Sequence, residues 1–407
     1  MFIARNMEKA IKELSKMFGA VLVAGARQVG KTTLLQKSIP GIRYITLDDP
    51  IMLRAAVEES GAFFKNAPPP VFVDEIQYAP QLFPHIKIML DAEKKKGQFY
   101  LSGSQQFHLM KNVTESLAGR IGIVNLLGLS LRETSGNDFS EPFLPTDDYF
   151  SKRGRASPAL SHDEIWDIIH RGSMPELCVN PEFNRQMFYG AYVKTYIQRD
   201  VRDLTQIGDE LKFMHFLTVA AANTGQLLNL SSLARDVGIS APTAERWLSI
   251  LIASGLVYLL RPYHNNITKR AVKTPKLYFL DTGLAAYLTK WTSPDVLRNG
   301  AMAGAFFETF VISEIIKSYT NAGVLEPPLF FYRDKDMREI DLLIENGGAL
   351  HPIEIKKHAD PKASDIAVFA ALDKIQGIKR GAGGVVCMYD GVVALKGEDV
   401  VMPMGIL

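Results

Sequence analysis

The segment "AVLVAGARQVGKTTLLQKS", residues 20–38, constrains the fold of this chain more than any other feature. It opens with an apolar run typical of a buried β-strand and ends with residues typical of a helix. Between them, Gly25 and Gly30 are separated by four residues and followed by Lys31 and Thr32. Glycines at this spacing let backbone N–H groups curl around a phosphate, and the lysine adds a positive charge. The segment therefore predicts a strand, a phosphate-binding loop and a helix.

A second strand-like run, "PPVFVDEIQ", ends in two carboxylates, Asp74 and Glu75. At the end of a buried strand, Asp74 is expected to hold Mg²⁺ through water, while the Thr32 hydroxyl binds the ion directly. Glu75 is the predicted catalytic residue, because it is placed to polarise the water that attacks the γ-phosphate. No Asn-Lys-x-Asp guanine-reading motif follows this strand. The predicted cofactors are therefore ATP and Mg²⁺, and the predicted reaction is ATP hydrolysis.

Two later stretches offer further contacts to the nucleotide. Ser104 in "YLSGSQQ" is the first choice for a sensor of the γ-phosphate and Ser102 the second; a plain Ser-Gly turn is the alternative. Arg120 in "ESLAGRIG" fits either an arginine finger that reaches a neighbouring subunit in a homo-oligomer or an ordinary surface arginine. The residues predicted to bind the nucleotide are Gly25, Ala26, Arg27, Gln28, Val29, Gly30, Lys31, Thr32, Thr33, Ser104 and Arg120.

The rhythm of apolar residues divides the chain into three regions. From residue 19 to about residue 135, short β-rich runs alternate with helical ones, which predicts βαβ units and a parallel sheet. Residues 136–160 are rich in turn formers and predict a surface excursion or linker. Helical patterns follow, and the last region mixes helix and strand again. The predicted domains are 1–155, a P-loop ATPase domain; 156–295, a helical region; and 296–407, a second α/β domain.

Within the helical region, residues from about 215 to 285 have the pattern of a winged helix, that is helix, turn, helix and then two strands. Its longer helix, "APTAERWLSILIASG", offers one basic residue, Arg246. The loop between the two strands is basic, with Arg261, Lys269, Arg270, Lys273 and Lys276. Such a wing can lie along DNA phosphates without reading sequence, and it can equally serve only to pack beside the nucleotide domain. Both interpretations stay open.

The stretch "EIDLLIENGGALHPIEIKK", residues 339–357, predicts two strands around a turn at Asn346 and Gly347. The alternating apolar residues are Ile340, Leu342, Ile344, Ile353 and Ile355. If all five share one buried face, then Asp341, Glu354 and Lys356 share the other, with Asp341 diagonal to Glu354. Two carboxylates can hold Mg²⁺, and a nearby lysine can stabilise a developing phosphate charge.

Glu308, in the upstream helix "AGAFFETFVISE", can complete this carboxylate cluster. The plainer interpretation is a solvated strand face, because charges at alternate strand positions usually point to water. The pattern alone therefore leaves a metal site and a solvated surface as alternatives.

Composition limits the class of protein. Forty-six basic and forty-four acidic residues nearly cancel, so any nucleic-acid binding has to come from a local patch. Cys178 and Cys387 are the only cysteines, which predicts a reducing compartment and excludes a disulfide framework. The N-terminal segment lacks the uncharged apolar run of a signal peptide, and no stretch approaches the length of a membrane span. A cytoplasmic location without membrane contact is expected.

Several further stretches occur together with these motifs, namely "SLAGRI", "TYIQRDV", "KLYFLDTGL", "GAFFETFV" and "FYRD". The ordered set resembles a family of prokaryotic predicted ATPases in which an AAA-type module is fused to a C-terminal domain of unknown function with a restriction-endonuclease-like core. The resemblance covers nearly the whole chain. It implies an α/β fold with a P-loop sheet, a helical and winged-helix region, and a restriction-endonuclease-like α/β domain.

The resemblance also implies roles for the hairpin residues. In the nuclease superfamily a helix Glu, a strand Asp and a Glu-x-Lys pair form a metal-dependent site, and these positions fall on Glu308, Asp341, Glu354 and Lys356. Asp341 and Glu354 would be the metal ligands. The implied function is an Mg·ATP-dependent ATPase whose nucleotide state controls a nuclease-like domain that binds or cleaves DNA. The alternative is an ATP-gated scaffold whose nuclease-like domain is inactive and docks protein or RNA.

Overall fold

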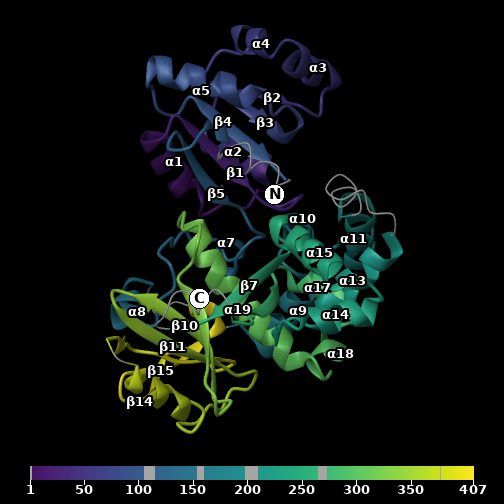
Figure 1. Ribbon diagram of the computed structural model, residues 1–407. Helices are drawn as coiled ribbons and strands as arrows, with labels where there is room; N and C mark the ends of the chain where they lie inside the picture. Colours follow the sequence, from purple (N-terminus) through teal and green to yellow (C-terminus); the bar gives the residue numbers. More distant parts are fainter. Residues whose placement is uncertain (1, 105–114, 154–159, 198–209, 265–272, 376) are drawn as a thin grey trace.

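The computed structural model of the chain describes residues 2–104, 115–153, 160–197, 210–264, 273–375 and 377–407. The N-terminal sheet and its helices form one lobe, and a helical region and a C-terminal sheet lie beneath it in Figure 1. The architecture is mixed α/β, as the sequence predicts. None of the described helices is long and apolar enough to cross a membrane.

The N-terminal lobe is built on a five-stranded parallel sheet in the order β2-β3-β4-β1-β5, which confirms the predicted parallel sheet. Its strands are β1 (Ala20–Ala24), β2 (Arg43–Thr46), β3 (Val71–Asp74), β4 (Phe99–Gly103) and β5 (Ile121–Asn125). Its helices are α1 (Glu8–Met17), α2 (Lys31–Ser38), α3 (Pro50–Glu58), α4 (Ser60–Asn66) and α5 (Leu82–Glu93), with a 3₁₀ turn η1 (Ile76–Tyr78) after β3.

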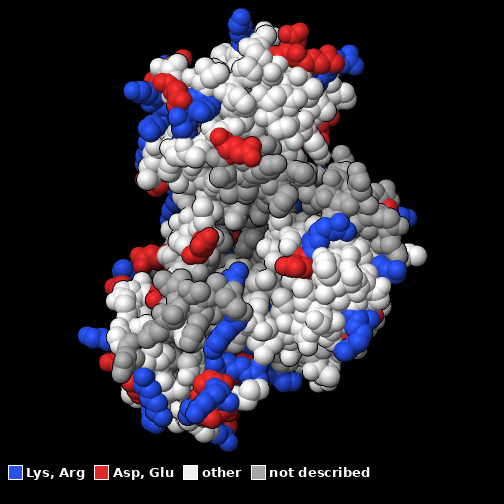
Figure 2. Space-filling model, in the orientation of Figure 1, with Lys and Arg blue, Asp and Glu red and all other residues white. Residues whose placement is uncertain are grey.

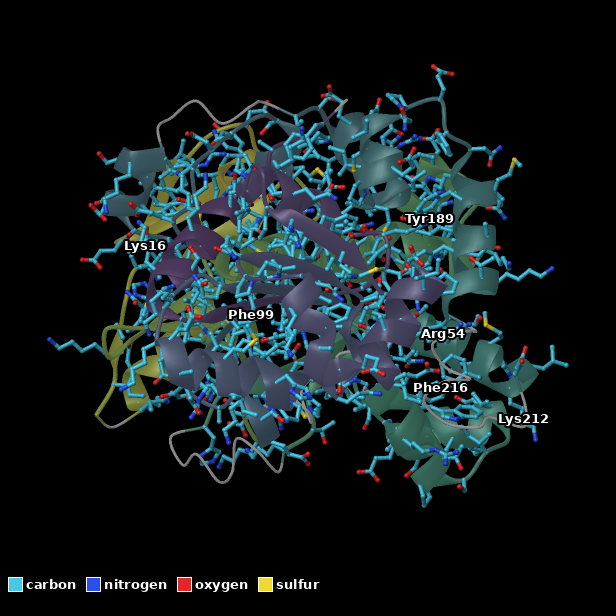
Figure 3. The ribbon with its side chains drawn as sticks, turned by 90° about the horizontal axis from the view of Figure 1, so that it is seen from above. Lys16, Arg54, Phe99, Tyr189, Lys212 and Phe216 are labelled. Atoms are coloured by element: carbon cyan, nitrogen blue, oxygen red, sulfur yellow. The ribbon has the colours of Figure 1, made fainter. Side chains whose placement is uncertain are left out.

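Every residue of the interior strand β1 is buried, because helices cover both faces of this sheet. Val21 and Val23 pack with residues of α1 and α2, whereas Ala20 and Leu22 pack with residues of α3, α4 and α5 on the opposite face. Phe99 of β4 lies inside the lobe (Figure 3). In the sequence, a strand that is buried on both faces appears as a continuous apolar run.

The helical region contains eight described α-helices: α9 (His162–Arg171), α10 (Pro175–Val179), α11 (Arg185–Tyr192), α13 (Glu210–Ala222), α14 (Leu230–Val237), α15 (Ala241–Ala253), α17 (Thr282–Leu288) and α18 (Pro294–Arg298). A π-helical turn, η2 (Val193–Ile197), extends α11. Its strands are β6 (Gln226–Leu227), β7 (Val257–Pro262) and β8 (Lys276–Phe279), and β8 pairs antiparallel with both others. Tyr189 of α11 and Phe216 of α13 are buried, whereas Lys212 of α13 lies at the periphery (Figure 3). The helices and hairpin follow the order predicted from the sequence, and the name winged helix stays a prediction.

The C-terminal region begins with the long helix α19 (Ala303–Asn321). Its strands are β9 (Leu329–Arg333), β10 (Glu339–Asn346), β11 (Ala349–Ile355), β12 (Lys379–Arg380), β13 (Gly384–Cys387), β14 (Val393–Lys396) and β15 (Asp399–Pro403), with the 3₁₀ segments η3 (Ala367–Lys374) and η4 (Met404–Ile406). Strand β7 of the helical region pairs in parallel with β9, so ten strands form one sheet. The predicted boundary between residues 295 and 296 therefore falls between strands of a single sheet.

The segment predicted as a surface linker, residues 136–160, is packed into the molecule in its described part. Phe143 and Tyr149 are buried, and the hydroxyl of Tyr149 donates to the Ile406 carbonyl at 3.0 Å. Tyr149 belongs to helix α8 (Asp147–Arg153). The linker interpretation was wrong, because a turn-rich composition reports an irregular backbone and says nothing about long-range partners that bury it.

A buried carboxylate, Glu133, joins three segments at the base of the N-terminal lobe. Glu133 lies in the short helix α7 (Leu131–Thr134) and caps it together with Ser130. Its Oε1 accepts from Arg5 Nε at 2.9 Å and from the Asn6 N–H at 3.0 Å. The same Arg5 donates through Nη1 to the Val29 carbonyl at 2.8 Å, inside the glycine-rich loop. This contact set fixes the glycine-rich loop relative to α7.

Helix α19 continues the connection into the lower half of the molecule. Glu314 Oε2 accepts from the Leu131 N–H at 2.7 Å, at the start of α7. Glu314 Oε1 accepts from Lys317 Nζ at 2.7 Å, and Lys317 also donates to the Leu129 carbonyl at 3.0 Å. Both side chains are almost wholly buried. A buried ion pair that is also hydrogen-bonded to backbone holds α19 against the N-terminal lobe.

We expect Glu133→Ala to lower the free energy of unfolding by about 3–5 kcal/mol, because it leaves the buried Arg5 guanidinium without its carboxylate. Chemical denaturation followed by circular dichroism measures the change. The control is Glu141→Ala, which removes an exposed partner of Lys152 and should cost at most about 1 kcal/mol. Equal losses in the two variants would contradict the structural role given to Glu133.

Candidate functional site

The glycine-rich loop connects β1 to α2 as the sequence predicts. Gly25 has a φ of 153° and Gly30 a φ of 93°. A side chain at Gly25 would collide with the Leu126 carbonyl oxygen, so the loop tolerates only glycine there. Lys31 Nζ donates to the carbonyls of Gly25 and Ala26 at 3.1 and 2.8 Å. The lysine therefore lies over the loop, at the place where a phosphate would meet its N–H groups.

Asp74, at the end of β3, is the centre of a hydrogen-bond cluster beside the loop. Its Oδ2 accepts from the Thr32 hydroxyl at 2.7 Å and from the Tyr44 hydroxyl at 3.1 Å. Ser102 donates to Oδ1. Burial, together with the charge of Asp74, raises the pKa of Tyr44 to about 12. A hydroxyl and a carboxylate in contact at a phosphate loop fit an Mg²⁺ ion that takes Thr32 as ligand and Asp74 through water.

The two candidate serines lie in or beside this cluster, and their role as sensors of the γ-phosphate stays a prediction. Ser102, the second choice for a γ-phosphate sensor, is bound to Asp74. Ser104, the first choice, lies with its hydroxyl 3.4 Å from Glu75 Oε2. Tyr44 was not singled out from the sequence, because its strand, β2, carries no motif and only the parallel pairing of β2 with β3 brings it to Asp74.

Glu75 follows Asp74 in an unusual backbone conformation. Its φ is 55°, a left-handed value that is uncommon for a residue other than glycine. Its Oε2 accepts from Gln77 Nε2. Residues held in such conformations cost about 1–3 kcal/mol and cluster at functional sites. Glu75 lines the cavity above the loop, and its catalytic role stays a prediction.

A cavity of about 580 Å³ lies over the glycine-rich loop, a size that accommodates a nucleotide. Its first wall consists of Arg27, Gln28, Gly30, Lys31, Thr32, Thr33 and Glu75. Of the other loop residues assigned to the nucleotide, Ala26 and Val29 are buried. The second wall consists of Pro175, Glu176, Phe183 and Phe188, which the sequence did not single out. They come from the helical region, far along the chain, so only the tertiary structure brings them here.

Arg120 lies at the other end of the same sheet. It precedes β5, whose first residue is paired with Ala20 at the start of β1, whereas the glycine-rich loop follows the end of β1. Five strand residues separate the two ends by about 16 Å. Arg120 Nε and Nη2 contact the Asp91 carboxylate at 2.6 and 3.0 Å. Arg120 therefore does not serve its own loop, and its role toward a neighbouring subunit stays a prediction.

The C-terminal hairpin forms between β10 and β11, with the register of Leu342 opposite Ile353 and Asn346 opposite Ala349. The turn residues are therefore Gly347 and Gly348, both at positive φ, and the predicted Asn346-Gly347 turn was wrong by one residue. Two glycines satisfy both left-handed positions of a tight hairpin turn, which explains the shift.

The assumption of a single buried face was also wrong for Ile340. Leu342, Ile344, Ile353 and Ile355 belong to one core cluster, whereas Ile340 packs in another. A register shift in β10, between Ile340 and Leu343 in its pairing with β9, changes the face on which residues point. Apolar alternation does not reveal such an irregularity when both faces of a strand are buried.

The predicted cluster nevertheless assembles. Asp341 Oδ2 accepts from the Ile355 N–H at 2.9 Å, on the strand that carries Glu354 and Lys356. Lys356 Nζ donates to Glu354 Oε1 at 2.7 Å. Glu308 comes from α19 and lies close enough to Asp341 for the two carboxyls to affect each other's protonation. The structure thus brings the four predicted residues together, and it buries Glu354 while Glu308, Asp341 and Lys356 are partly buried rather than on a solvated face.

The sequence missed the residue at the centre of this cluster, which is Lys276 of β8. Its Nζ lies 2.9 Å from Glu308 Oε1, 2.7 Å from Glu339 Oε1 and 4.0 Å from Asp341 Oδ1. The Tyr278 hydroxyl donates to the same Glu308 oxygen at 2.6 Å. Lys276 was expected in a basic loop for phosphates; that was wrong, because its side chain is only 5% exposed. The alternation of Lys276 and Tyr278 on one strand was the signal available.

Burial and mutual repulsion raise the pKa values of the carboxyls in this cluster. The pKa of Glu308 is raised to about 7, chiefly by burial and then by the charge of Asp341. The pKa of Asp341 is likewise raised to about 7, by burial and by Glu354. Glu354 Oε2 is buried and has no hydrogen-bond partner among the described residues.

Carboxylates of this kind suit Mg²⁺ in chemical type, but here Glu308 and Glu339 are already paired with the Lys276 ammonium, at 2.9 and 2.7 Å. Among the described residues, no group of three or more His, Cys, Asp or Glu side chains is placed to hold a metal.

We expect Glu308→Gln to weaken the pH dependence of stability. The pKa of Glu308 is raised from 4.5 to about 7, so the folded chain keeps a proton that the unfolded chain releases. The free energy of unfolding should therefore fall as pH rises across this window, by up to ~3 kcal/mol from this group. Urea denaturation at several pH values measures the slope. Glu326→Gln, at an exposed position, is the control, and an unchanged slope in Glu308→Gln would contradict the assignment.

Three family models match successive parts of the chain. Residues 18–135 match an AAA domain, residues 162–295 a domain of unknown function (DUF8612), and residues 303–407 another domain of unknown function (DUF4143). Uncharacterized proteins of Mycobacterium bovis and Mycobacterium tuberculosis are each 28% identical to this chain over 356 residues, which cover 84% of this chain and 71% of each relative.

Two solved structures align with parts of this chain. A Walker-type ATPase of Pyrococcus abyssi aligns with a TM-score of 0.44 at 16% identity, over 71% of this chain and 96% of that one. A RuvB protein of Thermotoga maritima aligns with a TM-score of 0.26 at 17% identity, over 62% of this chain and 85% of that one. Alignments with such low identity and TM-score say nothing about the function of this chain. The family match, the parallel sheet and the phosphate-binding loop together identify residues 18–135 as an AAA-type P-loop domain.

Proposed function

We propose that this chain is an Mg²⁺-dependent ATPase whose nucleotide state is passed to its C-terminal sheet. The observation that carries the proposal is the contact between Thr32 and Asp74, at 2.7 Å, beside Lys31 and beneath the cavity. Mg²⁺, when bound, would neutralise phosphate charge next to these two side chains. Lys31 would exchange the Gly25 and Ala26 carbonyls for phosphate oxygens. Glu75 would orient the attacking water from the other edge of the cavity.

A continuous set of contacts supports the transfer of nucleotide state. Arg5 bonds both to the Val29 carbonyl in the loop and to Glu133. Glu133 caps α7, whose first N–H is bound by Glu314 of α19. The same helix carries Glu308 into the C-terminal cluster. A shift of the loop on ATP binding would thus act on α19 through hydrogen-bonded groups that are buried.

For the C-terminal region we propose a binding role without cleavage. The supporting observation is Lys276, whose ammonium pairs with Glu308 and Glu339 and approaches Asp341. Lysine and arginine side chains lie along the junction of the C-terminal sheet and the helical region on the face shown in Figure 2. Arg246, Arg261 and Lys273 are exposed and could contact DNA phosphates, whereas the predicted contacts Lys269 and Arg270 lie outside the described residues.

A metal-dependent nuclease is the second candidate. It is favoured by the convergence of Glu308, Asp341, Glu354 and Lys356, and by the buried Glu354 oxygen that has no partner in the described part of the chain. Cleavage would require Lys276 to leave the cluster. The binding role and the nuclease role therefore differ in whether Lys276 stays paired with the carboxylates.

We expect Lys31→Ala to abolish ATP binding, since the loop then lacks its phosphate-binding charge. Glu75→Gln should still bind ATP but hydrolyse it at least ~10²-fold more slowly, because the amide does not polarise water. Titration with a fluorescent ATP analogue and a phosphate-release assay measure the two effects. Lys37→Ala, at the exposed end of the same helix, is the control. Normal hydrolysis by Glu75→Gln would rule out its assigned role.

We expect the wild-type chain to leave supercoiled plasmid and single-stranded DNA intact with Mg²⁺ or Mn²⁺, with and without ATP, because Lys276 already pairs with Glu308, one of the four residues of the predicted metal site. Gel electrophoresis of the DNA checks this. Cleavage that disappears in Asp341→Ala but persists in Asp336→Ala, at an exposed position, would establish the nuclease instead. ATP hydrolysis should be normal in both variants.

A further inference from the structure

The nucleotide cavity has a wall that no phosphate chemistry explains. Opposite the glycine-rich loop it is formed by the helical region, with Glu176 in α10, Phe183 in the loop that follows it, and Phe188 in α11. The two regions touch beside the cavity. The Tyr192 hydroxyl donates to the Arg27 carbonyl at 3.5 Å, and Gly255 lies against Ala26. The wall is thus held in place against the loop.

Two phenyl rings face this otherwise polar cavity. Phe183 is 47% exposed, although burial of its ring elsewhere would be favourable. Phe188 is fixed in orientation by its neighbours: its ring is nearly parallel to that of Tyr192, at 6.3 Å between centroids, and edge-on to that of Tyr189, at 5.3 Å. An exposed ring and a half-buried ring that line a cavity beside a phosphate loop are suited to stacking on a nucleobase, since every base has a flat π-face.

Glu176 adds a directional acceptor to the same wall. Its Oε1 accepts from Asn180 Nδ2 at 2.7 Å, which anchors the carboxylate one helical turn from the end of α10. Adenine carries an exocyclic amine that donates a hydrogen bond, whereas guanine carries a carbonyl oxygen at the corresponding ring position. A carboxylate that faces position 6 of the base would accept from the adenine amine and repel the O6 carbonyl of guanine.

We propose that Phe183 and Phe188 stack on the base of the bound nucleotide and that Glu176 selects adenine through its exocyclic amine. This inference rests on the proposed ATP binding. The triphosphate would bind to the loop of the N-terminal lobe and the base to the helical region. One ATP molecule would therefore contact both regions at once, beside the direct contacts of Tyr192 and Gly255 with the loop.

The first test separates the base from the phosphates. Dissociation constants for Mg·ATP and for inorganic tripolyphosphate with Mg²⁺ are measured by calorimetry on the full chain. In the double variant Phe183→Ala, Phe188→Ala, ATP should bind roughly 10-fold or more weakly, while tripolyphosphate binding should change little. Met187→Ala is the matched control, because Met187 lies on α11 next to Phe188, is 73% exposed and does not line the cavity.

Three results would overturn the inference. Unchanged ATP affinity in the double variant would show that the rings do not hold the base. An equal loss for ATP and tripolyphosphate would show that they support only the phosphate loop. Failure of the wild-type chain to bind either ligand would remove the proposed ATPase function itself, which distinguishes it from the first two results. Thermal unfolding of each variant verifies that it is folded.

The second test concerns the choice of base. The wild-type chain should prefer ATP to GTP, and Glu176→Gln should reduce that preference at least several-fold, because the amide can also donate to the guanine carbonyl. Tripolyphosphate affinity should be the same in both proteins. A preference for ATP that survives in Glu176→Gln would overturn the role of Glu176.

Discussion

The buried Glu133 carboxylate is the interaction on which the arrangement of the molecule depends. It accepts hydrogen bonds from Arg5, from the Asn6 N–H and from the Ser130 N–H. Arg5 and Asn6 precede the first strand of the N-terminal lobe, and Ser130 follows its last strand. Arg5 in turn bonds to the Val29 carbonyl. A buried charge of this kind is stable only when all of its partners are in place, so the glycine-rich loop, α1 and α7 have one relative position.

The cluster around Asp74 and the C-terminal cluster around Lys276 both limit uncompensated buried charge, but they do so in different ways. Asp74 accepts from neutral donors, Thr32, Ser102 and Tyr44, which leaves its negative charge available to the Mg²⁺ of the proposed Mg·ATP complex. The C-terminal carboxyls are met by Lys276, a cation that belongs to the chain. Burial makes uncompensated charge costly in both places. The arrangement at Asp74 is suited to a ligand that binds reversibly, and the arrangement at Lys276 is suited to a permanent contact within the chain.

The ion pairs of Lys276 lie where strands of the helical region join the C-terminal sheet. Lys276 is on β8, Glu308 on α19 and Glu339 on β10, so its ion pairs span the part of the sheet where β7 meets β9. The helical region also forms the second wall of the nucleotide cavity. A change at the nucleotide would therefore reach the C-terminal sheet by two routes, one through α19 and one through the shared sheet.

The sequence by itself determined the features that depend on local backbone chemistry. Gly25, Gly30, Lys31 and Thr32 form a phosphate-binding loop wherever a strand precedes them and a helix follows, and apolar runs alternating with helices imply a parallel sheet. Alternation also indicated that Asp341, Glu354 and Lys356 come together. The tertiary structure alone decided which distant groups meet them: Lys276 at Glu308, Tyr44 at Asp74, and Phe183 and Phe188 opposite the loop. These contacts depend on the packing of whole elements. No local pattern carries that information, because strands buried on both faces and turn-rich segments are compatible with many partners.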